Sequence, residues 1–267
     1  MRIGAYQTNP LFGEVKKNVI EAVEDLSQAD ADLVVLPELF NTGYQFVSVD
    51  EVADLAEEIP SGRTCQAMMS LARDRDLSLV FGLAEKDNGR FFNSAAIVGP
   101  AGFVGKYRKT HLFDEEKDFF SPGDTGFRVF EIDQAVIGVM ICFDWWFPES
   151  ARSLALLGAD IICHPANLVL PQCQQAMLTR SLENGVFTIT ANRVGSESRG
   201  GKARLLFTGQ SQIVDRFGKR LARLSKEQTG LAVTTVSPEE ARNKGIARRN
   251  DRFADRRPRF YQPLVRD

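Results

Sequence analysis

Hydrophobic residues follow two alternating patterns along this chain. Residues 2–7 and 77–86 form nearly continuous hydrophobic runs, which are typical of strands buried on both faces. In residues 14–29, hydrophobic side chains instead recur at helical spacing on one face. The same patterns predict strands at residues 32–38, 135–142, 160–167, 186–192 and within 230–242, and helices at residues 63–76, at 172–185 and from Pro148 onward.

Two further stretches are typical of β-hairpins. Residues 92–109 contain two strand-like runs around the turn sequence GPAG, and residues 206–225 contain two around DRFGK. Alternating strands and helices predict a parallel sheet covered by helices, and the hairpins add antiparallel strands. We therefore expect an α/β fold with mixed sheets. No linker or break in composition divides residues 1–267, which predicts a single domain.

The composition narrows the class of protein. The 267 residues are 43% hydrophobic and 25% charged, as is usual for a globular chain, and the net charge of -2 provides no overall attraction for nucleic acid. No stretch reaches the roughly 18 consecutive apolar residues that span a bilayer, and the N-terminus lacks the apolar core of a secretion signal. The four cysteines form no CxxC pair, which favours free thiols. We expect a cytoplasmic protein without a membrane partner.

Three chemically useful side chains follow predicted strands. Glu38 follows the run DLVVLP, Lys109 follows FVGKYR, and Cys142 follows AVIGVMI. Sites in α/β sheets gather beyond the carboxyl ends of strands, so we expect the three to meet. A thiolate, a carboxylate and an ammonium together suit nucleophilic acyl transfer. Taken singly, each also has a structural interpretation, as a core cysteine, a turn glutamate and a solvated lysine.

The sequence around Cys142, GVMICFDWWFPESAR, favours the catalytic interpretation. A turn between a strand and a helix would expose the thiol and aim the backbone N–H of Phe143 at a developing oxyanion. A nearby Lys109 would lower the pKa of the thiol. Trp145, Trp146 and Phe147 could wall a dry pocket.

These segments resemble the nitrilase superfamily of carbon–nitrogen hydrolases. The motifs are LPELFNTGY around Glu38, YRKTHLF around Lys109 and ICFDWWFPESAR around Cys142, in the family's order and at similar spacing. The resemblance covers nearly the whole chain. It implies a single-domain four-layer α-β-β-α sandwich with Glu38 as general base, Lys109 as stabiliser of the tetrahedral intermediate and Cys142 as nucleophile. It also implies a second glutamate, for which we choose Glu116 over its neighbour Glu115.

The resemblance extends to substrates and partners. Nitrilases tend to follow the cysteine with Trp-Glu, whereas Phe143-Asp144 is closer to aliphatic amidases, N-carbamoyl amidases and certain archaeal nitrilase-like groups. We therefore favour small linear amides, with nitriles as the alternative. The matching motifs place Tyr44, Trp145 and Asn167 in the substrate pocket. No metal or cofactor is implied. We expect a homodimer or larger homo-oligomer, with the tail at residues 242–267 packed at a subunit contact.

Other functions are less well supported. A papain-like pairing of Cys142 with His111 or His164 lacks an orienting asparagine, and a zinc site at Cys163, His164 and Cys173 lacks the usual ligand spacing. The arginines of the tail suggest nucleic-acid binding, but interspersed acidic and aromatic residues favour a packing role. A scaffold that has lost activity is disfavoured because all three reactive residues are present.

Overall fold

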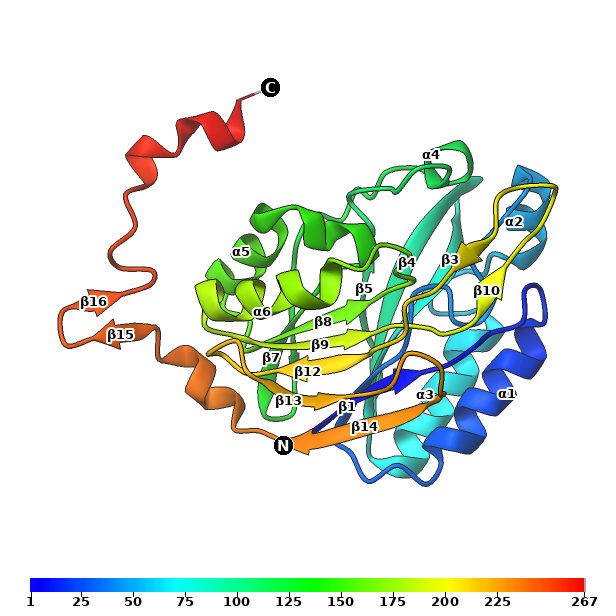
Figure 1. Ribbon diagram of the computed structural model, residues 1–267. Coiled ribbons are helices and arrows are strands. Elements are labelled where there is room, and N and C mark those ends of the chain that lie inside the picture. The colour runs from blue at the N-terminus through cyan, green and yellow to red at the C-terminus, as the bar shows by residue number, and fades with distance from the viewer. Residues whose placement is uncertain (267) are drawn as a thin grey trace.

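Two six-stranded sheets face each other in the computed structural model, which describes residues 1–266 (Figure 1). The first sheet has the order β14-β1-β2-β3-β4-β5, with β1 (Arg2–Gln7), β2 (Leu33–Val35), β3 (Ser78–Asp87), β4 (Arg90–Gly99), β5 (Gly102–Arg108) and β14 (Gly230–Thr235). The second has the order β13-β12-β9-β8-β7-β6, with β6 (Val129–Ile132), β7 (Ala135–Val139), β8 (Ile161–Pro165), β9 (Phe187–Ala191), β12 (Gln212–Val214) and β13 (Arg220–Arg223).

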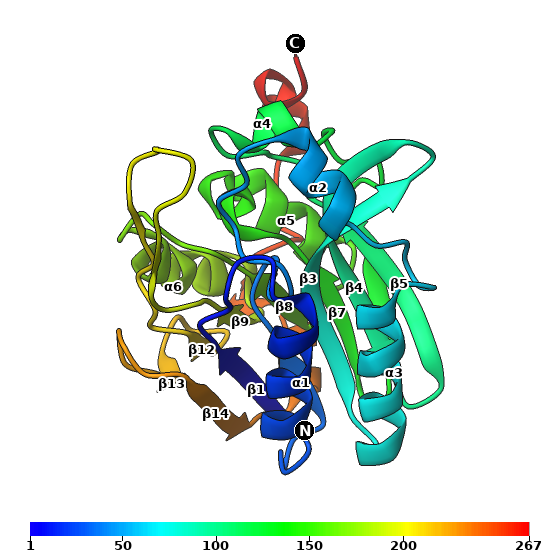
Figure 2. The same cartoon turned by 90° about the vertical axis from the view of Figure 1, so that its right-hand side faces the viewer.

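Two long helices cover the outer face of each sheet (Figures 1 and 2). These are α1 (Val15–Leu26) and α3 (Arg63–Arg75) on the first sheet, and α5 (Pro148–Leu156) and α6 (Cys173–Asn184) on the second. The layers are therefore helix, sheet, sheet and helix, which confirms the four-layer α-β-β-α sandwich that the resemblance implied. Shorter elements border the sheets: α2 (Val49–Leu55), α4 (Glu116–Phe119), β10 (Ser196–Glu197) and β11 (Leu205–Leu206).

Burial on both faces explains the continuous hydrophobic runs. In β2, Leu33 and Val35 pack in the layer between the sheets, whereas Val34 packs against the outer helices. All three side chains are fully buried. Because successive residues of a strand point to opposite faces, a strand covered on both sides needs hydrophobic residues at every position. The core therefore consists of an inter-sheet layer and two helix-facing layers.

Some predicted boundaries were wrong. The expected hairpin at residues 206–225 is shorter, because Gly209 and Gln210 both adopt positive φ and interrupt the chain ahead of β12. Helix α2 and strand β6 were not expected. A signal for α2 was present, since Ser48 caps it by accepting a hydrogen bond from the backbone N–H of Glu51 at 3.2 Å.

The tail follows a short helical turn at Pro238–Arg242, and its first part stays in contact with the end of α6 (Figure 1). Lys244 Nζ donates to the carbonyls of Asn184 and Gly185 at 3.1 and 3.0 Å. The tail contains a small hairpin of β15 (Gly245–Ala247) and β16 (Asn250–Asp251), followed by single turns up to residue 265. Residue 267, the last of the predicted tail, lies outside the described residues. None of the helices within the described chain combines the length and the apolar character needed to span a bilayer.

Strands that run in the same direction place their carboxyl ends at the same edge of each sheet. Strand β2 pairs in parallel with β1 and β3, and β7 and β8 pair in parallel in the second sheet. Strand β5 runs in the direction of β3, because both pair antiparallel with β4. The loops that follow β2, β5, β7 and β8 carry Glu38, Lys109, Cys142 and Asn167.

Gly82 of β3 allows the loop after β2 to lie directly on the strand. Its backbone N–H donates to the carbonyl of Pro37, and its own carbonyl accepts from Phe40 N–H, both at 3.1 Å. A Cβ atom at this position would lie 2.5 Å from the Cα of Glu38. Only glycine therefore permits the close backbone approach that sets the position of Glu38.

We expect Gly82→Ala to destabilise the protein by ~1–3 kcal/mol, the cost typical of overpacking, because the loop backbone must move. Thermal unfolding measures the change. Gly99→Ala is the matched control on β4, since its Cβ would meet its nearest neighbour, Ser78 Oγ, at an ordinary 3.5 Å. Equal melting temperatures for the two variants would contradict the role assigned to Gly82.

Candidate active site

Lys109 lies between two glutamates in the interior. Its Nζ donates to Glu38 Oε1 at 2.7 Å and to Glu116 Oε1 and Oε2 at 2.7 and 2.9 Å. The exposed fractions of Lys109, Glu38 and Glu116 are 1%, 0% and 5%. A buried ammonium is tolerable only when carboxylates hold it in this way.

Burial and mutual proximity shift the pKa values of Lys109 and Glu116. Burial alone would lower the pKa of Lys109, but the carboxylates of Glu116 and Glu38 outweigh it and raise that pKa, so the ammonium stays charged. Burial, together with the neighbouring Glu38, raises the pKa of Glu116 although Lys109 opposes the shift. The lysine is thus a fixed positive charge beside two carboxylates that compete for it.

Asn93 completes this group and was missed by sequence reasoning. Its Nδ2 donates to Glu38 Oε1 at 2.7 Å and approaches Glu116 Oε2 at 3.4 Å. It lies in β4, where a large polar side chain among mostly apolar, buried positions was the available signal. Glu38 Oε2 is buried and has no hydrogen-bond partner among residues 1–266, and the same holds for Asn167 Oδ1. These two acceptors remain available to a bound molecule.

Cys142 occupies a strained turn. It follows β7 with a φ of +40° and begins a short 3-10 helix, η1 (Cys142–Trp146), so a helical turn starts at the cysteine itself, ahead of the helix expected at Pro148. The ring of His164 donates from Nε2 to the Cys142 carbonyl at 2.9 Å. Burial lowers the pKa of His164 to about 4, so the ring is neutral and its Nδ1 accepts from the Thr190 hydroxyl.

The expected exposure of the Cys142 thiol was wrong, and the expected lowering of its pKa by Lys109 is present but outweighed. The residue is only 6% exposed, because the residues around the turn cover the thiol. Its pKa is raised well above the usual value, first by burial and then by Glu38, and the opposing influence of Lys109 is weaker. The resting group is therefore a neutral thiol.

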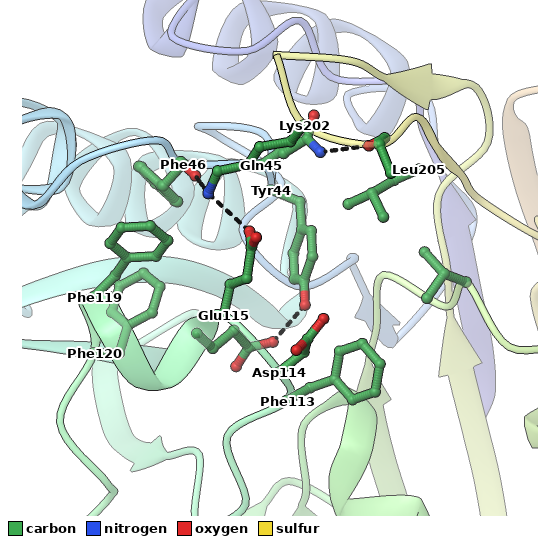
Figure 3. A pocket seen from close by; sticks show the side chains of 13 residues that line it. Tyr44, Gln45, Phe46, Phe113, Asp114, Glu115, Phe119, Phe120, Lys202 and Leu205 are labelled. Carbon is green, nitrogen blue, oxygen red and sulfur yellow. Dashed lines mark hydrogen bonds and ion pairs between the residues drawn. The ribbon is translucent and has the colours of Figure 1, made fainter. Parts of the chain in front are cut away.

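A cavity of about 130 Å³ lies beside these groups (Figure 3). Tyr44 lines it and donates from its hydroxyl to Glu116 Oε1 at 2.7 Å. A smaller hollow of about 20 Å³ next to Cys142 is lined by Phe143, Trp145 and Asn167 among others. Both share the walls Phe113 and Val169, and both are mostly apolar.

The neighbouring side chains that the sequence left open take different positions. Glu116 contacts Lys109, whereas Glu115 is half-exposed at the cavity and pairs with Lys202 at 2.8 Å (Figure 3). Trp145 is buried beside the thiol, but Trp146 is 49% exposed and does not line the hollow.

The two histidines do not form a papain-like pair with the thiol. His164 contacts the backbone carbonyl of Cys142, and His111 Nδ1 donates to Asp144 Oδ1 at 2.7 Å. Within the described part of the chain, no group of three or more His, Cys, Asp or Glu side chains is arranged to hold a metal ion.

Comparison with known proteins places this geometry in a family. The carbon–nitrogen hydrolase family profile matches residues 1–244. The chain is 49% identical to a nitrilase of Pyrococcus abyssi over 98% of this chain and 99% of that protein. It is 36% identical to an (R)-stereoselective amidase of Pseudomonas sp. over 85% of this chain and 82% of that protein.

Solved structures of carbon–nitrogen hydrolases and amidases have the same fold as this chain. A carbon–nitrogen hydrolase from Helicobacter pylori G27 superposes with a TM-score of 0.88 at 29% identity, covering 100% of this chain and 98% of that one. An amidase from Nesterenkonia sp. superposes with a TM-score of 0.81 at 25% identity, covering 99% and 96%. The chain therefore belongs to the carbon–nitrogen hydrolase family and is a hydrolase of the nitrilase superfamily.

Proposed function

We propose that this hydrolase cleaves small linear amides, N-carbamoyl compounds included, and that Cys142 carries the acyl group as a thioester. The observation that carries the proposal is that the two oxygens of the Glu38 carboxylate have different surroundings. One oxygen is held by Lys109 and Asn93, and the other is buried and free. A free, fixed carboxylate oxygen beside a protonated thiol is the arrangement that a general base requires.

Acylation follows from these positions. Cys142 Sγ attacks the carbonyl carbon while its proton passes to Glu38. The carbonyl oxygen takes up the electron pair and accepts hydrogen bonds from Lys109 Nζ and the backbone N–H of Phe143, each donor contributing up to ~3 kcal/mol. Glu116 holds the lysine in place and is itself held by Tyr44.

Release of the products reuses the same carboxylate. The C–N bond breaks as Glu38 returns its proton to the leaving nitrogen, and ammonia departs. Glu38 then takes a proton from a water molecule that attacks the thioester. The C–S bond breaks, the thiol is restored and the acid leaves. The mostly apolar hollow at the thiol, lined by Trp145 and Asn167, would hold the acyl group.

An amide can donate hydrogen bonds to the two unpartnered acceptors of the site, and a nitrile cannot. The NH₂ group of an amide or ureido substrate can donate to Glu38 Oε2 or Asn167 Oδ1, both of which lack a partner within the described residues. A nitrile nitrogen has no hydrogen to donate. In a glutamate-to-glutamine mutant of the amidase from Nesterenkonia sp. AN1, acrylamide is bound at the active site cysteine by Michael addition, which supports the role given to Cys142.

A nitrilase is the second candidate. The identity of 49% to the nitrilase of Pyrococcus abyssi favours it, and the same three reactive residues would serve. A nitrile would first add the thiol as a thioimidate and then consume one water molecule more than an amide before ammonia can leave. Assays with both substrate classes therefore separate the two reactions.

A panel of aliphatic amides, N-carbamoyl amines and nitriles of matched chain length should give ammonia mainly from the first two classes. Released ammonia is the measurement, and Cys142→Ala is the blank, because it removes the nucleophile and keeps the fold. Turnover of nitriles alone would replace the amide proposal with the nitrilase. Undiminished turnover by Cys142→Ala would remove the thiol from the mechanism.

Two adjacent glutamates provide a matched pair of variants. Glu116→Gln should lower kcat by roughly 10²-fold, the effect of misplacing a catalytic group, because the amide loses the charge that holds Lys109. Glu115→Gln should keep kcat, since Glu115 pairs with Lys202 and it is Glu116 that holds Lys109. Steady-state kinetics on the best amide measures both, and equal kcat values would show that Glu116 does not support the lysine.

We also propose that the tail mediates a homodimer or larger homo-oligomer. The described part of the tail exposes Ile246, Phe260 and Leu264 away from the body of the molecule, which is costly for a monomer in water (Figure 1). Sedimentation equilibrium should give at least twice the chain mass for the full-length protein. The double variant Phe260→Asp, Leu264→Asp should shift it toward the monomer, and a monomeric parent would refute the proposal.

A further inference from the structure

Asp144 joins the two chain segments that carry the reactive groups. It is fully buried in the first turn of η1, two residues after Cys142. Its Oδ2 accepts from Ile141 N–H and from the Tyr107 hydroxyl, both at 2.8 Å. Its Oδ1 accepts from the backbone N–H and the ring Nδ1 of His111, at 3.1 and 2.7 Å.

The partners lie on both sides of Lys109. Tyr107 is two residues before the lysine and His111 two residues after it. Between them, Thr110 donates its backbone N–H to the Tyr107 hydroxyl at 3.1 Å. The His111 ring stacks on Phe147, beyond the other end of η1, with ring centroids 3.8 Å apart. Residues 107–111, the lysine loop, thus surround the carboxylate of Asp144, which belongs to the cysteine turn at residues 141–144.

We propose that Asp144 is a positioning residue that fixes the Lys109 ammonium relative to the Cys142 thiol. This inference rests on the proposed function, because it takes the thiol to be the nucleophile. Asp144 touches neither the substrate cavity nor the thiol hollow, and it acts only through the two segments it connects.

The contacts require a carboxylate. Two backbone N–H groups, those of Ile141 and His111, are accepted by different oxygens of Asp144. Asparagine has one carbonyl oxygen, so in either orientation its NH₂ would face a backbone N–H. A buried donor left without an acceptor costs ~1–3 kcal/mol, and the lysine loop or the cysteine turn would move to avoid it.

Movement of the lysine loop has a consequence at the sulfur. The charged groups that act on Cys142 are Glu38, Glu116 and Lys109. Tyr44, a neutral phenol, adjoins these groups, and the neutral ring of His164 contacts the Cys142 carbonyl. The carboxylates raise the pKa of the thiol, and Lys109, aided by the Asn167 backbone N–H, lowers it. A lysine displaced from the thiol therefore leaves the thiolate less stable and the thiol pKa higher.

The test is the pH dependence of Cys142 alkylation in the full-length Asp144→Asn variant. Iodoacetamide is the probe, and mass spectrometry of the Cys142 peptide gives the rate, so no assumption about the natural substrate enters. We expect the midpoint of the rate profile to move to higher pH. On the best amide, we expect kcat to fall roughly 10²-fold with KM little changed, as for a misplaced catalytic group.

Asp160→Asn is the matched control. Asp160 is also a buried aspartate that accepts a strand backbone N–H, that of Val136 at 3.0 Å, and it pairs with Arg242. It lies at the start of β8, at the opposite end of the sheet from Cys142. Its substitution should lower the melting temperature and leave the alkylation profile and kcat unchanged.

An Asp144→Asn variant that loses stability but keeps the parental alkylation profile and kcat would overturn the proposal. Should that variant not fold, Tyr107→Phe and His111→Ala each remove part of the contact, and each should move the profile in the same direction by less. Parental profiles in both folded variants would likewise overturn it. A parent enzyme with no amidase or nitrilase activity would refute the proposed function and leave the alkylation result to be judged separately.

Discussion

The buried contact of Lys109 with Glu38 and Glu116 is the constraint on which the rest of the site depends. Removing one partner of a buried ion pair costs ~3–5 kcal/mol, so each of these groups needs the others in place. The three come from loops after β2 and β5 and from α4, and they meet only because the first sheet brings those loops to one edge. The positions of these three charged groups therefore depend on the register of the first sheet.

The same burial sets the state of the nucleophile. A thiol that were exposed beside a lysine would ionise readily, whereas Cys142 is covered and its pKa is raised by burial and by Glu38. In the proposed mechanism, deprotonation is thereby coupled to attack, with the free oxygen of Glu38 as the acceptor. A neutral resting thiol is less open to oxidation than a thiolate, so the covered site protects the group that it uses.

Much of the fold could be predicted from the sequence, because strands that are buried on both faces have continuous hydrophobic runs. The order of strands and helices followed from those runs, but the four layers came from the resemblance. Side-chain burial at the site was not readable, since Cys142 is covered by residues from other elements. The contacts of Asn93, Asp144 and His164 were missed for the same reason, because each includes a partner that is 22 to 55 residues away in sequence. The choice of Glu116 over Glu115 came from the resemblance, because the contact of Glu116 with Lys109 is a tertiary one that the local sequence does not indicate.

The strained turn at Cys142 explains why so many buried polar groups surround it. A non-glycine residue at a φ of +40° costs of the order of 1–3 kcal/mol and persists only where neighbours over-determine it. Here His164 fixes the carbonyl of Cys142, and Asp144 fixes the N–H of Ile141 just before it. Hydrophobic packing alone would let the turn relax, because it is not directional. Directional hydrogen bonds on both sides of the cysteine are what hold its sulfur toward the lysine and the glutamates.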